Sequence, residues 1–139
     1  MKNTKGSLEY LHISNQAAEA KITLQGAHIF HCQPKGSKPV LWVSESASFK
    51  KGKAIRGGIP VCWPWFGAHP TDSTLPNHGF ARTSLWKHIK TETISENETK
   101  VLLGLNSSQE SLQLWPFQFE LTLEIHIGRE LSVSLVTKN

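Results

Sequence analysis

The sequence predicts an all-β protein, an antiparallel β-sandwich that forms a single domain over residues 1–139. Apolar and polar residues alternate along much of the chain. The pattern is clearest from Phe117 to Ile127, where six odd-numbered positions are apolar and all five even-numbered ones are polar. No long stretch repeats apolar residues at the helical period. A length of 139 residues with 38% hydrophobic content is enough for one domain with its own core.

Short alternating or β-branched runs, separated by glycine, proline and polar turns, predict the individual strands. Two pairs of runs are joined by short turns, at residues 95–98 and 128–129, and are predicted hairpins. Only Ser108–Leu114 is predicted to be helical. The predicted strands are Leu8–Ile13, Ala20–Leu24, His28–Cys32, Val40–Val43, Trp86–Ile94, Lys100–Leu105, Phe117–Ile127 and Glu130–Thr137.

A long loop at about 49–82 is predicted to bind the ligand. Prolines at positions 60, 64, 70 and 76 fix φ and remove backbone donors, and glycines at 57, 58, 67 and 79 permit turns. Neither a long helix nor a central strand fits such a segment. A loop of this length in a compact domain is usually functional or disordered, and its aromatic content favours the functional interpretation.

Three side chains of this loop are candidate ligand contacts. Arg56 precedes two glycines, and a guanidinium held by a turn offers parallel donors to a phosphate, a carboxylate or vicinal hydroxyls. His78 and Arg82 lie four residues apart, and the imidazole can donate to a sugar oxygen or transfer a proton. The alternatives are a surface arginine in a basic neighbourhood and a histidine hydrogen-bonded within its own loop.

Aromatic residues of the same loop, Trp63, Trp65 and Phe66, are predicted to shape the pocket together with Asn77. Aromatic faces can stack on the C–H faces of a sugar ring or fill a core. Packing that shapes the pocket is the favoured interpretation for the two tryptophans. The other tryptophans, expected in the core or at its rim, are Trp42, Trp86 and Trp115.

Charge and composition limit the partners that we expect. The net charge of +4 and the pI near 9.2 fit either solubility or attraction to an anionic ligand, and without a long basic run no nucleic acid is expected. The longest apolar runs are too short to span a bilayer, so no membrane partner is expected. Cys32 and Cys62 are expected to be free thiols, which favours a cytoplasmic location.

Neither a metal nor a cofactor is expected. His28 and His31 would point to opposite faces of a predicted strand, and no second pair of ligands follows at metal-binding spacing. The chain also has no glycine-rich fingerprint of a nucleotide site.

Two linked motifs resemble the hexose-6-phosphate mutarotases, also called glucose-6-phosphate 1-epimerases, of the aldose 1-epimerase superfamily. They are RGGIPVCWPWFG at 56–67 and NHGFAR at 77–82, followed by Trp86. Weaker similarity extends over nearly the whole chain, in GAH at 26–28, LWVS at 41–44 and WPF at 115–117.

The resemblance implies a galactose mutarotase-like β-supersandwich and an isomerase activity. The reaction would exchange the α and β anomers of an aldohexose 6-phosphate by acid–base ring opening, without a cofactor. The resemblance further implies that Arg56 and Arg82 bind the substrate and that His78 contacts the sugar. Arg82 is a candidate for the 6-phosphate, and the choice between the two arginines stays open.

The family's catalytic histidine and glutamate follow the part resembled here, and neither has a counterpart in residues 1–139. We therefore expect a truncated sandwich, the N-terminal part of the family fold, that binds a hexose phosphate without a catalytic residue of its own. Two other classes stay open. One is a non-enzymatic carbohydrate-binding β-sandwich module that uses Trp63, Trp65 and Arg56; the other is a domain that self-associates through its exposed C-terminal strand, Glu130–Thr137.

Overall fold

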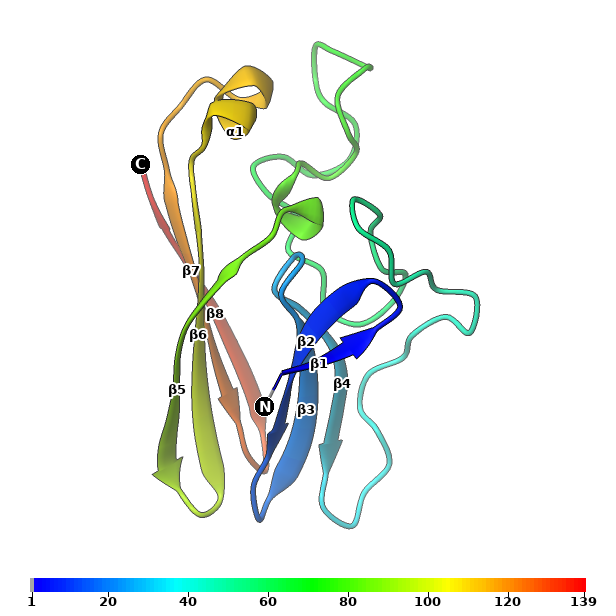
Figure 1. The fold of residues 1–139 in the computed structure, drawn as a ribbon, viewed down its shortest axis with the longest axis vertical. Helices are drawn as coiled ribbons and strands as arrows, with labels where there is room; N and C mark the ends of the chain where they lie inside the picture. The colour runs from blue at the N-terminus through cyan, green and yellow to red at the C-terminus, as the bar shows by residue number, and fades with distance from the viewer. Residues whose placement is uncertain (1) are drawn as a thin grey trace.

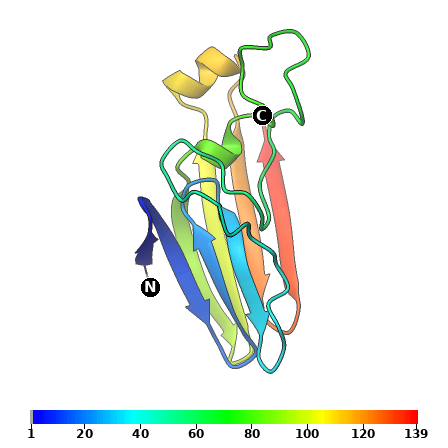
Figure 2. The same ribbon diagram turned by 90° about the vertical axis from the view of Figure 1, so that its right-hand side faces the viewer.

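The computed structural model describes residues 2–139, which form two four-stranded antiparallel β-sheets with a shared core (Figures 1 and 2). Within each sheet the strands lie in chain order, and the all-β antiparallel prediction is confirmed. The first sheet contains β1 (Lys2–Lys5), β2 (Leu8–Ser14), β3 (Ala18–Thr23) and β4 (His28–Pro34), and the second contains β5 (Lys87–Ser95), β6 (Glu98–Asn106), β7 (Glu120–Ile127) and β8 (Leu131–Lys138).

The main core lies between the two sheets because alternate residues of the strands point inward. Along β7, the side chains of Leu121, Leu123, Ile125 and Ile127 are buried, and the polar residues between them are more exposed. These four residues belong to one apolar cluster that also contains Ile22 of β3. The alternation read from the sequence therefore identifies the inward face of β7 correctly.

The predicted strand Val40–Val43 is wrong. Only Val43 forms an isolated antiparallel bridge, with Gly57. The partner segment cannot extend the ladder because Gly57 and Gly58 both have positive φ values, 116° and 65°, which are outside the extended region.

One late strand start and one unpredicted strand are further differences from the prediction. The strand expected from Phe117 begins only at Glu120, because Pro116 has no N–H and the amide of Phe117 bonds back to the carbonyl of Trp115. Strand β1 was not predicted, since its sequence, Lys-Asn-Thr-Lys, has no apolar alternation; it is held by antiparallel pairing with β2.

The helix predicted at Ser108–Leu114 is confirmed as α1 (Gln109–Leu114), with Ser108 as its N-cap. Ser108 and Ser111 form reciprocal side-chain to backbone hydrogen bonds, which satisfy amides that the first turn leaves free. A single 3-10 turn, η1 (Ala81–Thr83), precedes β5. In residues 2–139 no helix is long and apolar enough to cross a membrane.

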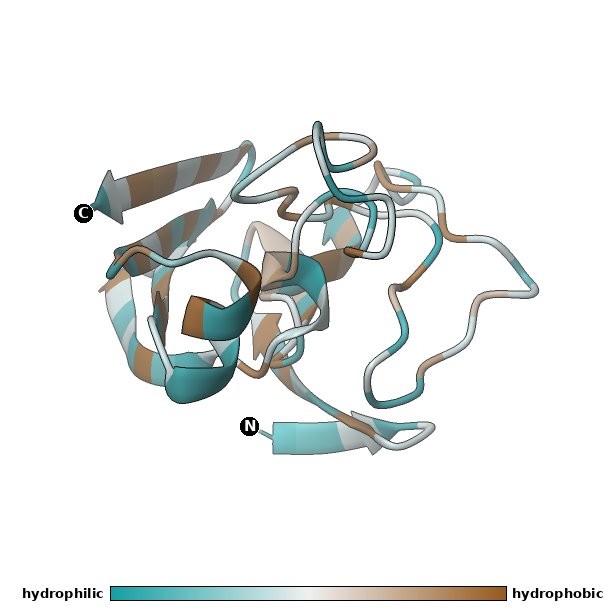
Figure 3. Ribbon diagram, turned by 90° about the horizontal axis from the view of Figure 1, so that it is seen from above, coloured by the Kyte–Doolittle hydropathy of each residue, from teal (hydrophilic) through white to brown (hydrophobic). Residues whose placement is uncertain are grey.

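Strand β8 forms an open edge of the second sheet, and its apolar residues are the brown bands of the ribbon in Figure 3. Val133, Leu135 and Val136 are 36%, 39% and 57% exposed. The C-terminal strand is thus exposed, as the sequence predicted, whereas self-association through it stays a prediction.

Candidate functional site

The predicted ligand-binding loop runs outside the two sheets, in the cyan-to-green part of Figure 1. Two isolated bridges tie it to the rest of the chain, since Gly57 pairs with Val43 and Ile59 pairs with Ile29 of β4. A third bridge, between Trp63 and Gly79, joins two parts of the loop to each other. The loop is therefore anchored at several points along its length.

The turn that carries Arg56 rests on a buried histidine. His28 of β4 is only 1% exposed, and its Nε2 lies 2.6 Å from the carbonyl oxygen of Gly57. Because a carbonyl can only accept, Nε2 carries the proton and donates. Burial lowers the pKa of His28, against the effect of this hydrogen bond, and the positive charge of Arg82 lowers that pKa further. A neutral His28 thus holds the turn in place.

The Arg56 side chain is exposed, and its guanidinium makes no hydrogen bond within residues 2–139. The backbone of Arg56 accepts a hydrogen bond from the Ser44 amide, and the amide of Gly58 donates to Trp42. These two hydrogen bonds flank the bridge between Val43 and Gly57 and fix the backbone that carries Arg56. Arg56 is therefore a free cation on an anchored turn.

The sequence-based prediction for Trp42 differs from the structure. Trp42 was expected in the core or at its rim, but it is 69% exposed, so the core interpretation is wrong for it. Trp86, in contrast, is 1% exposed, and its indole N–H donates to the carbonyl of Ala81. Large apolar side chains are usually buried, so the exposure of Trp42, next to the bridge that anchors the loop, is informative.

His78 is fixed within the loop through one ring nitrogen. Its Nδ1 accepts a hydrogen bond of 3.0 Å from the amide of Gly67, and its own amide donates to the Gly67 carbonyl. The loop-bonded alternative is thus correct for Nδ1, whereas Nε2 carries the proton of the neutral ring and has no partner within residues 2–139. The ring of Phe66, 81% exposed, packs against the His78 ring at a centroid distance of 4.7 Å.

Arg82 is held beside the backbone that precedes His78. Its Nη2 donates a hydrogen bond of 3.1 Å to the carbonyl of Asn77. Its positive charge also contributes to the lowered pKa of His28, which hydrogen-bonds to Gly57, the residue after Arg56. The structure therefore places Arg82 next to the His78 segment, and the convergence of Arg56 with these two residues on one pocket stays a prediction.

The other aromatic residues of the loop are largely engaged in packing. Trp63 has ring contacts with Trp115 and Phe119 at centroid distances of 5.0 and 4.5 Å. Trp65 donates from its indole N–H to the carbonyl of Pro76. These contacts agree with packing as the main role of both tryptophans, and their part in shaping a pocket stays a prediction.

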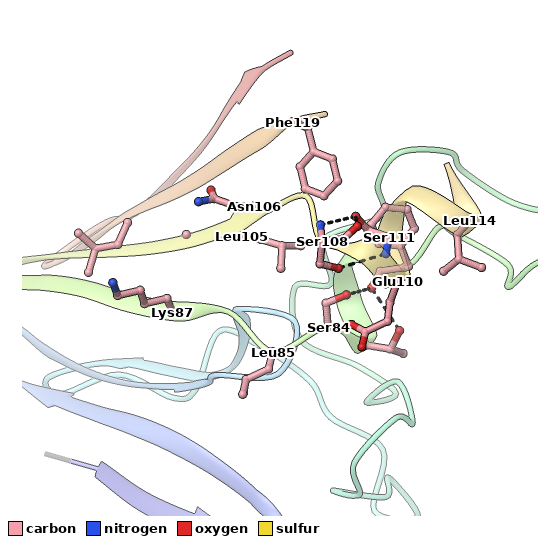
Figure 4. A pocket seen from close by; sticks show the side chains of 14 residues that line it. Ser84, Leu85, Lys87, Leu105, Asn106, Ser108, Glu110, Ser111, Leu114 and Phe119 are labelled. Carbon is pink, nitrogen blue, oxygen red and sulfur yellow. Dashed lines mark hydrogen bonds between the residues drawn. The ribbon is translucent and has the colours of Figure 1, made fainter. Parts of the chain in front are cut away.

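A cavity of about 670 Å³ lies between α1, the end of β6, the start of β5 and the residues that follow η1 (Figure 4). Leu105 and Leu114 contribute apolar surface to it, and the hydroxyl groups of Ser84 and Ser108 are already used in hydrogen bonds to the backbone. Arg56, His78 and Arg82 do not line this cavity. The predicted binding residues therefore form a separate, loop-borne surface.

Comparison with known proteins identifies related sequences and structures. The sequence profile described as aldose 1-epimerase matches residues 9–139. Proteins named "Putative glucose-6-phosphate 1-epimerase" from Salmonella typhimurium and Escherichia coli are 36% and 37% identical to the chain over 128 residues. Each alignment covers 92% of this chain and 43% of the relative, so the chain spans less than half the length of these relatives.

Solved structures show the same fold. The crystal structure of a "putative mutarotase (YeaD)" from Salmonella typhimurium is 33% identical, superimposes with a TM-score of 0.95, and is matched over 99% of this chain and 46% of that one. The Slr1438 protein from Synechocystis, 24% identical with a TM-score of 0.81, shares the fold as well.

Proposed function

Since the chain belongs to the aldose 1-epimerase family, we propose that it binds an aldohexose 6-phosphate, the substrate type of a hexose-6-phosphate mutarotase, through Arg56, His78 and Arg82. The observation that carries the proposal is the position of Arg82, which bonds to the backbone beside His78 and whose charge acts on the histidine below Arg56.

The free donors of this site suit a phosphorylated sugar. A guanidinium presents several N–H groups in a fixed plane and binds phosphate through two parallel hydrogen bonds. Arg56 is exposed and free to bind in this way. Arg82 uses Nη2 for its bond to Asn77 and keeps other N–H groups for a ligand. Following the family resemblance, we assign the 6-phosphate to Arg82. The Nε2–H of His78 can donate to a sugar oxygen, because Nδ1 is occupied by Gly67. His28, held neutral by burial, adds no charge that would compete for the phosphate.

The family reaction needs two proton transfers and no redox step. A base removes the proton of the anomeric hydroxyl while an acid protonates the ring oxygen, and the C1–O5 bond breaks to give the open-chain aldehyde. Rotation about C1–C2 and reclosure produce the other anomer and return both protons. We assign binding and orientation of the substrate to residues of this chain, and no proton transfer to any of them.

Binding measurements on the whole chain test this assignment. We expect glucose 6-phosphate to bind more tightly than glucose in isothermal titration calorimetry, and Arg82→Ala to weaken the phosphate-dependent part by about tenfold or more, as for a charge-assisted pair. Arg129→Ala, in the exposed turn between β7 and β8, is the matched control and should bind like the wild type. A coupled mutarotation assay should show no turnover above the spontaneous rate; clear turnover would contradict the assignment of proton transfer.

A second candidate is a carbohydrate-binding module without catalysis. It is favoured by two exposed aromatic side chains: Phe66 in the loop, at 81% exposure, and Trp42, at 69%, whose carbonyl accepts from the Gly58 amide. Exposed aromatic rings can stack on pyranose faces. This alternative predicts equal affinity for glucose and glucose 6-phosphate, and no loss in Arg82→Ala. That result would replace the phosphate-binding proposal.

A further inference from the structure

A second cavity, of about 780 Å³, lies where the edge strand of the first sheet, β1, approaches the edge strand of the second, β5. Figure 2 shows these two strands on the same side of the molecule, away from β4 and β8. None of Arg56, His78 and Arg82 lines this cavity. Its lining residues include three lysines, Lys2, Lys51 and Lys87, which come from three separate parts of the chain.

The ammonium groups of these lysines are unpaired. Within residues 2–139 the lysines that form ion pairs are Lys90, Lys100 and Lys138, and none of these lines the cavity. Glu9 is the one carboxylate among the lining residues. Three ammonium groups against one carboxylate leave an excess of two positive charges around the cavity.

Lys51 is held toward the cavity by a buried side chain. Gln25, 6% exposed, accepts a hydrogen bond from the Gly52 amide and donates to the carbonyls of Lys50 and Lys53. The amide of Lys51 itself donates to the hydroxyl of Ser7, another lining residue. The turn is therefore fixed on both sides.

The other two lysines also come from ordered backbone. Lys2 pairs with Leu11 in the ladder between β1 and β2. Lys87 follows Trp86, whose amide donates to the carbonyl of Leu24. His88 also lines the cavity: burial lowers its pKa, and the positive charge of Lys2 lowers that pKa further.

We propose that this cavity is a second binding site, specific for a phosphomonoester with an apolar substituent. A phosphomonoester carries about −1.5 to −2 charges at pH 7, which complements the excess of two positive charges. Lysine is a common phosphate ligand that acts as a point charge. Leu8, Leu24 and Leu85 line the cavity and supply an apolar wall for the substituent, and the volume falls within the range of small-molecule sites.

Phenyl phosphate and inorganic phosphate are the probes for this site, used with the whole chain in calorimetry. We expect phenyl phosphate to bind more tightly than inorganic phosphate because of the apolar wall. The triple variant Lys2→Gln, Lys51→Gln, Lys87→Gln should lose about tenfold or more in affinity for phenyl phosphate. The matched control, Lys21→Gln, Lys35→Gln, Lys38→Gln, removes the same charge elsewhere and should stay within about twofold.

The location is tested by NMR and by Arg82→Ala. Phenyl phosphate should shift the ring signals of His88 in the wild type but not in the cavity variant, and Arg82→Ala should keep its affinity for phenyl phosphate. The proposal is overturned by equal losses in the two triple variants, by ring signals of His88 that do not move, or by loss of binding in Arg82→Ala. If Arg82→Ala left glucose 6-phosphate binding unchanged, the proposed function would be overturned and this second site would stand, so the two proposals fail separately.

Discussion

Substitution of Gly58 by alanine tests whether the turn behind Arg56 is as tightly built as its contacts indicate. Gly58 has φ of 65°, and a Cβ added there would overlap the carbonyl oxygen of Ile29 and lie 2.8 Å from Nε2 of His28. Both neighbours are committed, since the Ile29 carbonyl accepts from the Ile59 amide and His28 Nε2 bonds to Gly57. Neither can move without loss of a hydrogen bond.

Gly36 provides the matched control for the backbone term. It has a similar φ of 76°, but a Cβ there would meet nothing within 4 Å. An alanine at either position in the left-handed region costs about 1–2 kcal/mol of unfolding free energy. At Gly58 the steric overlap adds about 1–3 kcal/mol, the usual cost of overpacking. The difference between the two variants, about 1–3 kcal/mol, is therefore the contribution of the packed turn.

Urea unfolding followed by circular dichroism measures this difference directly, and a thermal scan should show Gly58→Ala melting roughly 3–9 °C below Gly36→Ala. Because the turn carries Arg56, Gly58→Ala should also weaken glucose 6-phosphate binding, whereas Gly36→Ala should leave it unchanged. Equal losses of stability in both variants would show that the Ile29 and His28 contacts yield easily, and would refute the argument for a rigid turn.

Three further predictions concern other parts of the chain. Glu124 and Glu98 each lie 2.7 Å from a ring nitrogen of His126 and raise its pKa above the ordinary 6.5. The stabilisation of the folded state by these pairs is therefore complete below pH 6.5 and is lost as the pH rises through the raised pKa. Urea unfolding at several pH values should show this fall in the free energy of unfolding, and His126→Gln should remove it. If β8 mediates self-association, light scattering should detect dimers at high concentration that Leu135→Lys abolishes, and a monomeric wild type would contradict it. Sugar phosphate binding should change tryptophan fluorescence, and Trp42→Phe should remove most of that change; an undiminished change would exclude Trp42 from the site.

Much of the fold could be predicted because burial on one face of a strand leaves a period-two record in the sequence. The record is complete in β7, where the inward positions from Leu121 to Ile127 are all apolar. It is missing in β1, whose strand conformation comes from pairing with β2. At Val40–Val43 a run of four apolar residues is misleading, because the partner segment contains two glycines with positive φ.

The candidate site was only partly predictable for a related reason. The loop motifs identified Arg56, His78 and Arg82, but not His28, which lies 29 residues before the carbonyl that it bonds. A histidine at an inward position of an apolar strand is a signal that such a partner exists. Its identity depends on how the loop folds back, which short-range patterns do not contain.

The positive charge of the chain is not spread evenly, and its two concentrations differ in what they can recognise. Arg82 is hydrogen-bonded to the carbonyl of Asn77, so its planar group is held in one orientation while other N–H donors stay free. Lys2, Lys51 and Lys87 are unpaired and present charge without a fixed direction. A sugar whose anomeric carbon must be placed with respect to its phosphate needs an oriented partner, and a simple phosphomonoester needs only complementary charge. This difference is the physical reason for assigning the hexose phosphate to the arginines and the phosphomonoester to the lysine-lined cavity.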